Sequence, residues 1–157
     1  METAHPDIVV TSPDGEYLII VEIKPNNSSV ADQSVIEQLR YLMASTSCSA
    51  GLAVSGEHIF LLRDSLEKPH GESIDVVGEA RLPDSLLPPS DEQWQEARAL
   101  EFASRVQQWL EQLKLTSNLE NLPDGLRALL AEPIMSLLRF GEIRAAGPRW
   151  NKVAVET

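Results

Sequence analysis

The sequence lacks the features that mark secreted, disulfide-linked and membrane-spanning proteins. A single cysteine among 157 residues excludes an internal disulfide and any metal site built from several cysteines, which favours a reducing compartment. The longest aliphatic run, residues 18–21, is far shorter than the roughly 20 apolar residues that span a bilayer. The first residues show neither the basic nor the apolar segment of a secretory signal. We therefore expect a cytoplasmic protein that does not enter a membrane.

Basic side chains are scarce as well. The chain has 13 Lys and Arg against 24 Asp and Glu, which gives a formal net charge of −11. Proteins that bind nucleic acid without sequence preference usually carry a basic surface, so this balance argues against such binding. The length and the mixture of apolar and charged residues are otherwise typical of one folded globular domain.

The first part of the chain has the pattern of an α/β core. Two β-branched and aliphatic runs, residues 8–11 and 17–24, flank the turn sequence Ser-Pro-Asp-Gly, so a β-hairpin is expected. The spacing of apolar residues then predicts a helix, a second strand pair and one further strand, at residues 30–44, 50–54, 58–62 and 73–77.

The second part of the chain has the pattern of a helical section. Three prolines within residues 82–90 mark a linker, so we divide the chain into a core at residues 1–81 and a helical extension at residues 82–157, packed on or beside the core. Helices are expected from Ser90 to Leu113 and over residues 126–140, the latter interrupted by a proline. The residues after this second helix are expected to form a loose tail.

Asp7, Glu22 and Lys24 carry the most informative chemistry, because the hairpin can bring them together. A two-residue loop at Asp14 and Gly15 places Asp7 directly opposite Glu22, and strand alternation puts Lys24 on the same face. A four-residue loop keeps Asp7 on that face but diagonal to Glu22. A three-residue loop with a bulge at Gly15 places Asp7 on the opposite face.

Two carboxylates on neighbouring strands repel each other, and a divalent cation would relieve this repulsion, since Mg²⁺ and Mn²⁺ prefer hard oxygen ligands. Glu22 follows the aliphatic run, so we expect a buried carboxylate, which is costly unless it is paired or bound to metal. A bound ion would polarise a phosphoryl oxygen, and Lys24 would orient a water or stabilise the developing charge. The hairpin therefore predicts a site for metal-dependent phosphodiester hydrolysis.

Pro6-Asp7, a glycine-containing hairpin and Glu22-Ile23-Lys24, followed by a helix and a strand pair, resemble the PD-(D/E)XK nuclease superfamily. That group includes restriction endonucleases and archaeal Holliday-junction resolvases. The resemblance covers roughly residues 6–64. It implies a restriction-endonuclease-like mixed sheet with flanking helices, here with a C-terminal helical extension, and the activity of an endonuclease or exonuclease.

The resemblance also implies roles for single residues. The metal ligands for Mg²⁺ or Mn²⁺ would be Asp7, Glu22 and the carbonyl of Ile23, and the catalytic group would be Lys24, with Gln38 and Tyr41 lining the site as in the exonuclease-like branches. Only five residues precede the proline–aspartate, so we expect the helix that normally lies before it to be missing. The later helices or a second subunit are therefore expected to cover the exposed face of the sheet.

A basic stretch near the C-terminus is the candidate contact for nucleic acid. Its side chains would bind the backbone and stack a base, and they are Arg144, Arg149, Trp150 and Lys152. The alternative is a solubilising tail. Because residues 1–64 carry nine acidic and three basic side chains, attraction of nucleic acid would need this tail, a homodimer groove or a partner subunit. DNA is expected in preference to RNA.

Two other interpretations stay open. The chain would be a catalytically inactive descendant of the same fold, acting as a binding or assembly module, or an unrelated α/β domain with a coincidental motif. The remaining reactive side chains are assigned no chemistry: the histidines are expected at strand ends or in a turn and the thiol in a loop, at His5, His58, His70 and Cys48.

Overall fold

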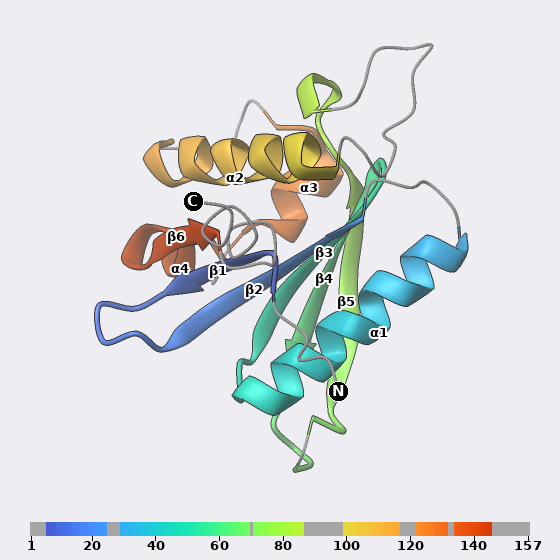
Figure 1. Ribbon diagram of the computed structural model, residues 1–157, viewed down its shortest axis with the longest axis vertical. Helices are drawn as coiled ribbons and strands as arrows, with labels where there is room; N and C mark the ends of the chain where they lie inside the picture. The colour runs from blue at the N-terminus through green and yellow to red at the C-terminus, as the bar shows by residue number, and fades with distance from the viewer. Residues whose placement is uncertain are drawn as a thin grey trace, which may run out of the picture.

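A computed structural model describes residues 6–24, 29–69, 71–86, 99–116, 122–131 and 134–145 of the protein. Its centre is a six-stranded mixed sheet with helices on both faces (Figure 1). The strands are β1 (Ile8–Thr11), β2 (Tyr17–Lys24), β3 (Ala50–Ser55), β4 (His58–Asp64), β5 (Ile74–Arg81) and β6 (Glu142–Ala145). The helices are α1 (Ser29–Thr46), the short 3₁₀ helix η1 (Asp84–Leu86), α2 (Ala99–Leu115), α3 (Asp124–Leu129) and α4 (Ile134–Phe140).

The order of strands in the sheet is β5-β4-β3-β2-β1-β6. β2 and β3 are parallel neighbours joined by α1, whereas the other neighbouring strands are antiparallel. A helix crossover is the usual connection between parallel strands, and here it places the start of α1 near the carboxyl end of β2. The expected hairpin, helix and second strand pair of the first part of the chain are confirmed.

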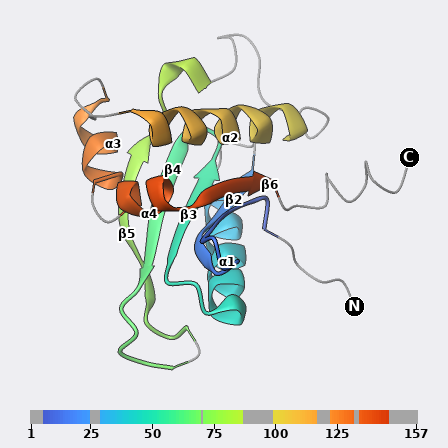
Figure 2. The same ribbon diagram turned by 90° about the vertical axis from the view of Figure 1, so that its left-hand side faces the viewer.

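The two faces of the sheet bury separate apolar cores. α1 packs on one face, through residues such as Val35 and Leu39, against Val9 and Ile20 of the sheet. We call this side the α1 face. The other face is covered by α2, α3 and α4, and Figure 2 views the molecule from that side, with α1 behind the sheet. The later helices therefore cover the sheet face that was expected to be exposed in the absence of a helix before Pro6.

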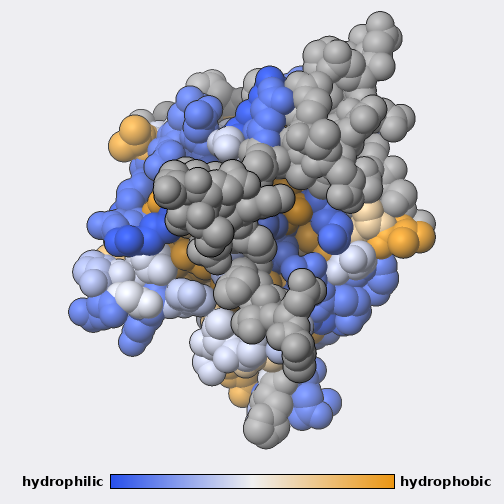
Figure 3. Space-filling view, in the orientation of Figure 1, coloured by the Kyte–Doolittle hydropathy of each residue, from blue (hydrophilic) through white to orange (hydrophobic). Residues whose placement is uncertain are grey.

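α2 shows why these residues form a helix in this position. Phe102, Val106 and Leu110 are fully buried and recur at intervals of four, which gives one apolar stripe toward the sheet. Its other side is charged and polar. Where the surface in Figure 3 belongs to described residues, hydrophilic side chains dominate, with smaller apolar patches between them.

The end of the described chain differs from the expected tail. Instead of one interrupted helix followed by loose residues, two short helices are followed by β6, which pairs with β1. Gly141 makes this return possible, because a Cβ atom there would lie 2.6 Å from Val10 Cγ1. Elements from both sides of residue 82 thus contribute to one sheet, and the division into two parts stays a prediction.

No helix in the described part of the chain is both long enough and apolar enough to cross a membrane.

Candidate functional site

The hairpin loop is one residue longer and more irregular than the two-residue loop that is the simplest expectation. Ser12 accepts a backbone hydrogen bond from Gly15 and donates one to Glu16, so the loop has three residues, and Gly15 takes a φ of 89°. This loop alone would place Asp7 on the face opposite Glu22. A second irregularity compensates for it, because Val10 pairs with Ile19 whereas the next residue pairs with Tyr17.

The two irregularities cancel in the register farther along the hairpin. Ile8 pairs with Val21, so the next position in the same register brings Asp7 opposite Glu22. Leu18, the residue skipped by the pairing, packs instead toward the core under α2 to α4. The structure thus brings the two carboxylates together. It does so with a three-residue loop, which by itself was expected to place them on opposite faces.

Asp7 and Glu22 each bind the backbone of the other strand. The backbone N–H of Asp7 donates to Glu22 Oε1 at 3.1 Å, and the backbone N–H of Ile23 donates to Asp7 Oδ2 at 2.9 Å. These bonds hold β1 to the end of β2. The pair lies on the α1 face, because Val9 and Ile20, two residues away along the strands, point into the core under α1.

Burial gives Glu22 unusual acid–base behaviour. The residue is 3% exposed, and burial, together with the charge of Asp7, raises the pKa of Glu22 from 4.5 to about 8, against the opposing effects of an N–H donor from Asp7 and the charge of Lys24. A carboxyl group with this pKa binds either a proton or a cation at neutral pH. The expectation of a buried glutamate is confirmed.

Lys24 lies on the same face as the pair, two residues after Glu22. Its side chain is half-buried, and its backbone carbonyl accepts a hydrogen bond from Gly56 at 2.9 Å. Among the described residues, none forms an ion pair with the Lys24 ammonium. The structure therefore places the ammonium where its charge acts on Glu22.

Gln38 and Tyr41 lie on α1 but are not equally close to the sheet. Gln38 is partly buried at the edge of the apolar stripe, whereas Tyr41 is 58% exposed on the outer side of the helix. No hydrogen bond within the described ranges joins either side chain to Asp7 or Glu22. Their role in lining the site stays a prediction.

The donor set for a metal ion is small. The structure's described residues contain no group of three or more His, Cys, Asp or Glu side chains placed to hold a metal. The predicted set consists of two carboxylates, from Asp7 and Glu22, and the main-chain carbonyl of Ile23. The part played by this carbonyl also stays a prediction.

Arg144 is the one residue of the basic stretch within the described ranges. It lies on β6 opposite Val9, so it shares the α1 face with Asp7. Strand spacing and rise place the two backbones about 8 Å apart. The guanidinium is exposed and paired with Glu142. Arg149, Trp150 and Lys152 lie outside the described residues.

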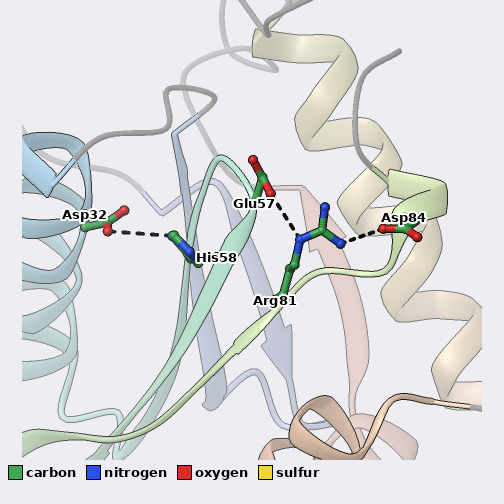
Figure 4. Close-up of polar contacts among 5 residues, drawn as sticks. All are labelled: Asp32, Glu57, His58, Arg81 and Asp84. Atoms are coloured by element: carbon green, nitrogen blue, oxygen red, sulfur yellow. Dashed lines mark hydrogen bonds and ion pairs between the residues drawn. The ribbon is translucent and has the colours of Figure 1, made fainter. Parts of the chain in front are cut away.

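Sequence reasoning missed a second polar group on the α1 face. His58, expected to be an ordinary strand-end residue, has its Nδ1 atom 3.8 Å from Asp32 Oδ2, on the first turn of α1 (Figure 4). Nearby, the Arg81 guanidinium binds Glu57 and Asp84. Strand alternation from Phe60 predicts the face of His58, but its approach to Asp32 depends on how α1 packs.

No family of known proteins matches the chain, and no curated protein or solved structure matches it. The interpretation of the site therefore depends on its own residues and geometry.

Proposed function

We propose that the protein is a metal-dependent nuclease with a restriction-endonuclease-like fold of the PD-(D/E)XK superfamily. The observation that carries this proposal is the position of Asp7, Glu22 and Lys24 on one face at the end of two neighbouring strands. Hydrolysis of a phosphodiester at such a site needs a bound cation and a positive group beside it. The two carboxylates would bind the cation, and Lys24 would be the positive group.

The residues present fit a hard divalent cation. The donor atoms are carboxylate oxygens with a main-chain carbonyl nearby, which suits Mg²⁺ or Mn²⁺. The raised pKa of Glu22, about 8, means that ionising this carboxyl in the metal-free protein costs free energy. A cation offsets that cost because it replaces the proton.

The chain's own groups have distinct tasks in the proposed reaction. Asp7 and Glu22, with the Ile23 carbonyl, would hold the cation. When bound, the cation supplies positive charge that polarises a phosphoryl oxygen and makes a nearby water more acidic. Lys24 would orient the attacking water or balance the negative charge on the phosphate. Gln38 and Tyr41 would contact the substrate from α1.

The proposed substrate is nucleic acid, DNA in preference to RNA. Arg144 supports a phosphate-containing substrate, because it places a guanidinium on the α1 face near Asp7. The other proposed contacts are Arg149, Trp150 and Lys152. The net charge of −11 predicts weak binding by one chain, so a homodimer or a partner subunit would supply further attraction.

Cleavage assays with matched variants test the proposal. Labelled single- and double-stranded DNA and RNA are incubated with Mg²⁺, Mn²⁺ or EDTA. We expect cleavage with metal only, and a loss of about 10²–10³-fold in Asp7→Asn and Lys24→Met, the range for removing a group that stabilises transition-state charge. Asp14→Asn, an exposed aspartate in the hairpin turn, is the control and should keep its activity. Cleavage that persists in EDTA or in Asp7→Asn contradicts the proposal.

A second candidate function is a catalytically inactive module of the same fold. The observation that favours it is the pair of hydrogen bonds between the Asp7 and Glu22 carboxylates and the backbone, because these bonds give both side chains a structural role without a metal. Fluorescence anisotropy with labelled DNA in EDTA distinguishes the two. Binding with no cleavage in any metal supports the inactive module.

A further inference from the structure

A row of polar side chains continues from Lys24 across three more strands of the sheet. Lys24 pairs with Ser55 of β3, Ser55 pairs with His58 of β4, and His58 pairs with Arg81 of β5. Paired residues on neighbouring strands point to the same face, and this is the α1 face, since Phe60, two residues after His58, packs under α1. The row therefore begins beside the Asp7–Glu22 pair.

The members of this row are not equally available to a substrate. Ser55 is fully buried. The Arg81 guanidinium is already bound by Glu57 and Asp84 at 3.1 and 2.6 Å (Figure 4). The His58 side chain is 46% exposed, unlike Ser55, and unlike Arg81 it is not held at hydrogen-bond distance by two carboxylates.

Asp32 lies beside His58. The Nδ1 atom of His58 is buried, has no hydrogen-bond partner among the described residues and lies 3.8 Å from Asp32 Oδ2, so the exposed part of the side chain is the rest of the ring. A carboxylate next to one nitrogen of an imidazole favours the ring orientation that directs the other nitrogen away from it. An imidazole held in this way is suited to donating a proton from Nε2.

The spacing between Lys24 and His58 suits a phosphodiester. They are two strands apart, so their backbones are separated by about 10 Å at the usual strand spacing. The short Ser55 side chain lies between them, and the longer Lys24 and His58 side chains extend past it. We expect side chains of this length to reach one phosphate group from both positions.

We propose that His58 is the general acid of the reaction, an inference that rests on the proposed nuclease function. A water oxygen attacks phosphorus and the water releases one proton to solvent, while the bond from phosphorus to the leaving oxygen breaks. The proton on His58 Nε2 passes to that oxygen, so the leaving strand departs as an alcohol and the imidazole is left neutral. The imidazole then regains a proton from solvent. Asp32 is a positioning residue, which acts through His58.

The test compares two substrates that differ in their need for a proton. An alkoxide leaving group, as in a DNA strand, needs protonation, whereas the nitrophenolate leaving group of a thymidine phosphate p-nitrophenyl ester does not. With Mg²⁺ or Mn²⁺ we expect His58→Ala to cleave DNA about 10²–10⁴-fold more slowly, the usual contribution of a general acid, while the ester is cleaved at nearly the wild-type rate. Asp32→Asn should show a smaller loss, again on DNA only.

The controls separate this inference from the proposed function. Asp75→Asn, an exposed aspartate on β5, should leave both rates unchanged. His58→Gln, which keeps a polar side chain, should repeat the selective loss and guards against a folding defect in His58→Ala. Equal losses on both substrates, or no loss on either, in both His58 variants overturn the role of His58 alone. A wild-type protein that cleaves neither substrate overturns the nuclease function and the role of His58 with it.

Discussion

Glu22 is the single residue whose chemistry the fold changes most. It lies on a strand between apolar neighbours and is nearly inaccessible to solvent. Its carboxyl accepts one backbone hydrogen bond from Asp7, too little to offset burial and the nearby negative charge. The metal-free protein therefore favours the protonated form of this side chain, and two measurements follow from that preference.

The first measurement is the pH dependence of stability in EDTA. Glu22 has a pKa of about 8 in the folded protein and 4.5 as its ordinary value, so the folded state binds more protons between these pH values. Its contribution to stability is fully present below the lower pKa and is lost as the pH rises through the higher one. We expect the Tm to fall over this window, and Glu22→Gln to flatten the fall. Glu16→Gln, exposed in the hairpin loop, should retain the wild-type slope. An unchanged slope in Glu22→Gln contradicts the prediction.

The second measurement is stabilisation by metal. A ligand that binds only the folded state at a hundred times its Kd stabilises a protein by about 2.7 kcal/mol. We expect Mn²⁺ to raise the Tm of the wild-type protein, with a larger effect above the pKa of Glu22, where no proton competes. Glu22→Gln and Asp7→Asn should lose most of this rise, which is read by thermal denaturation against EDTA. An equal rise in Glu22→Gln would show that the metal binds elsewhere.

The residues of the candidate pair could be predicted from sequence, but the route that joins them could not. Strand alternation placed Lys24 on the face of Glu22, and loops of two or four residues would add Asp7 to that face. The loop, however, has the three-residue form that separates them, and a skipped residue at Leu18 restores the register. Leu18 is drawn toward the core under α2 to α4, elements distant in sequence, so local patterns do not contain this information.

At the scale of elements, the contact between α1 and β3 positions Asp32 over His58. The contact is close because β3 has a glycine beneath the helix. A Cβ atom on Gly51 would lie 2.8 Å from Met43 Sδ and 2.9 Å from Leu39 Cδ1. The short distance between α1 and β3 therefore depends on residue 51 being a glycine.

Replacing that glycine tests the packing. Gly51→Val must displace side chains of α1, and we expect a loss of about 1–3 kcal/mol in the free energy of unfolding, as for other overpacked cores. The matched control is Gly78→Ala on β5, where the nearest atom to the added Cβ lies at 3.9 Å and a change within about 0.5 kcal/mol is expected. Urea denaturation measures both. Equal stability of Gly51→Val and the wild-type protein would mean that α1 can move away at little cost.

The element pattern was predictable where apolar residues alternate or recur over a long stretch. The hairpin strands begin and end at the expected residues, and α1 extends the expected helix by one to two residues. β6 was missed because it is only four residues long and has no buried side chain. Such a strand forms because β1 offers an open edge, and that edge is visible only once the sheet is assembled.

At the scale of the whole molecule, the negative charge and the proposed substrate have to be reconciled. The α1 face holds cations, namely Lys24, Arg81 and Arg144, yet Arg81 and Arg144 are already paired with carboxylates. We therefore expect the protein alone to bind polyanions weakly. This distribution of charge is the physical reason for proposing a homodimer or a partner subunit. A second subunit would supply the positive charge that is needed to extend the surface that binds nucleic acid.

The pairing of β6 with β1 also has a consequence for the timing of folding during synthesis. β1 can join β2 as soon as the hairpin has left the ribosome, but its other edge stays open until residues 142–145 follow. Contacts that span most of a chain are slow to form, and an unpaired edge is prone to wrong pairing in the interval. Asp7, directly before β1, therefore gains its final surroundings only after residues 142–145 have been made.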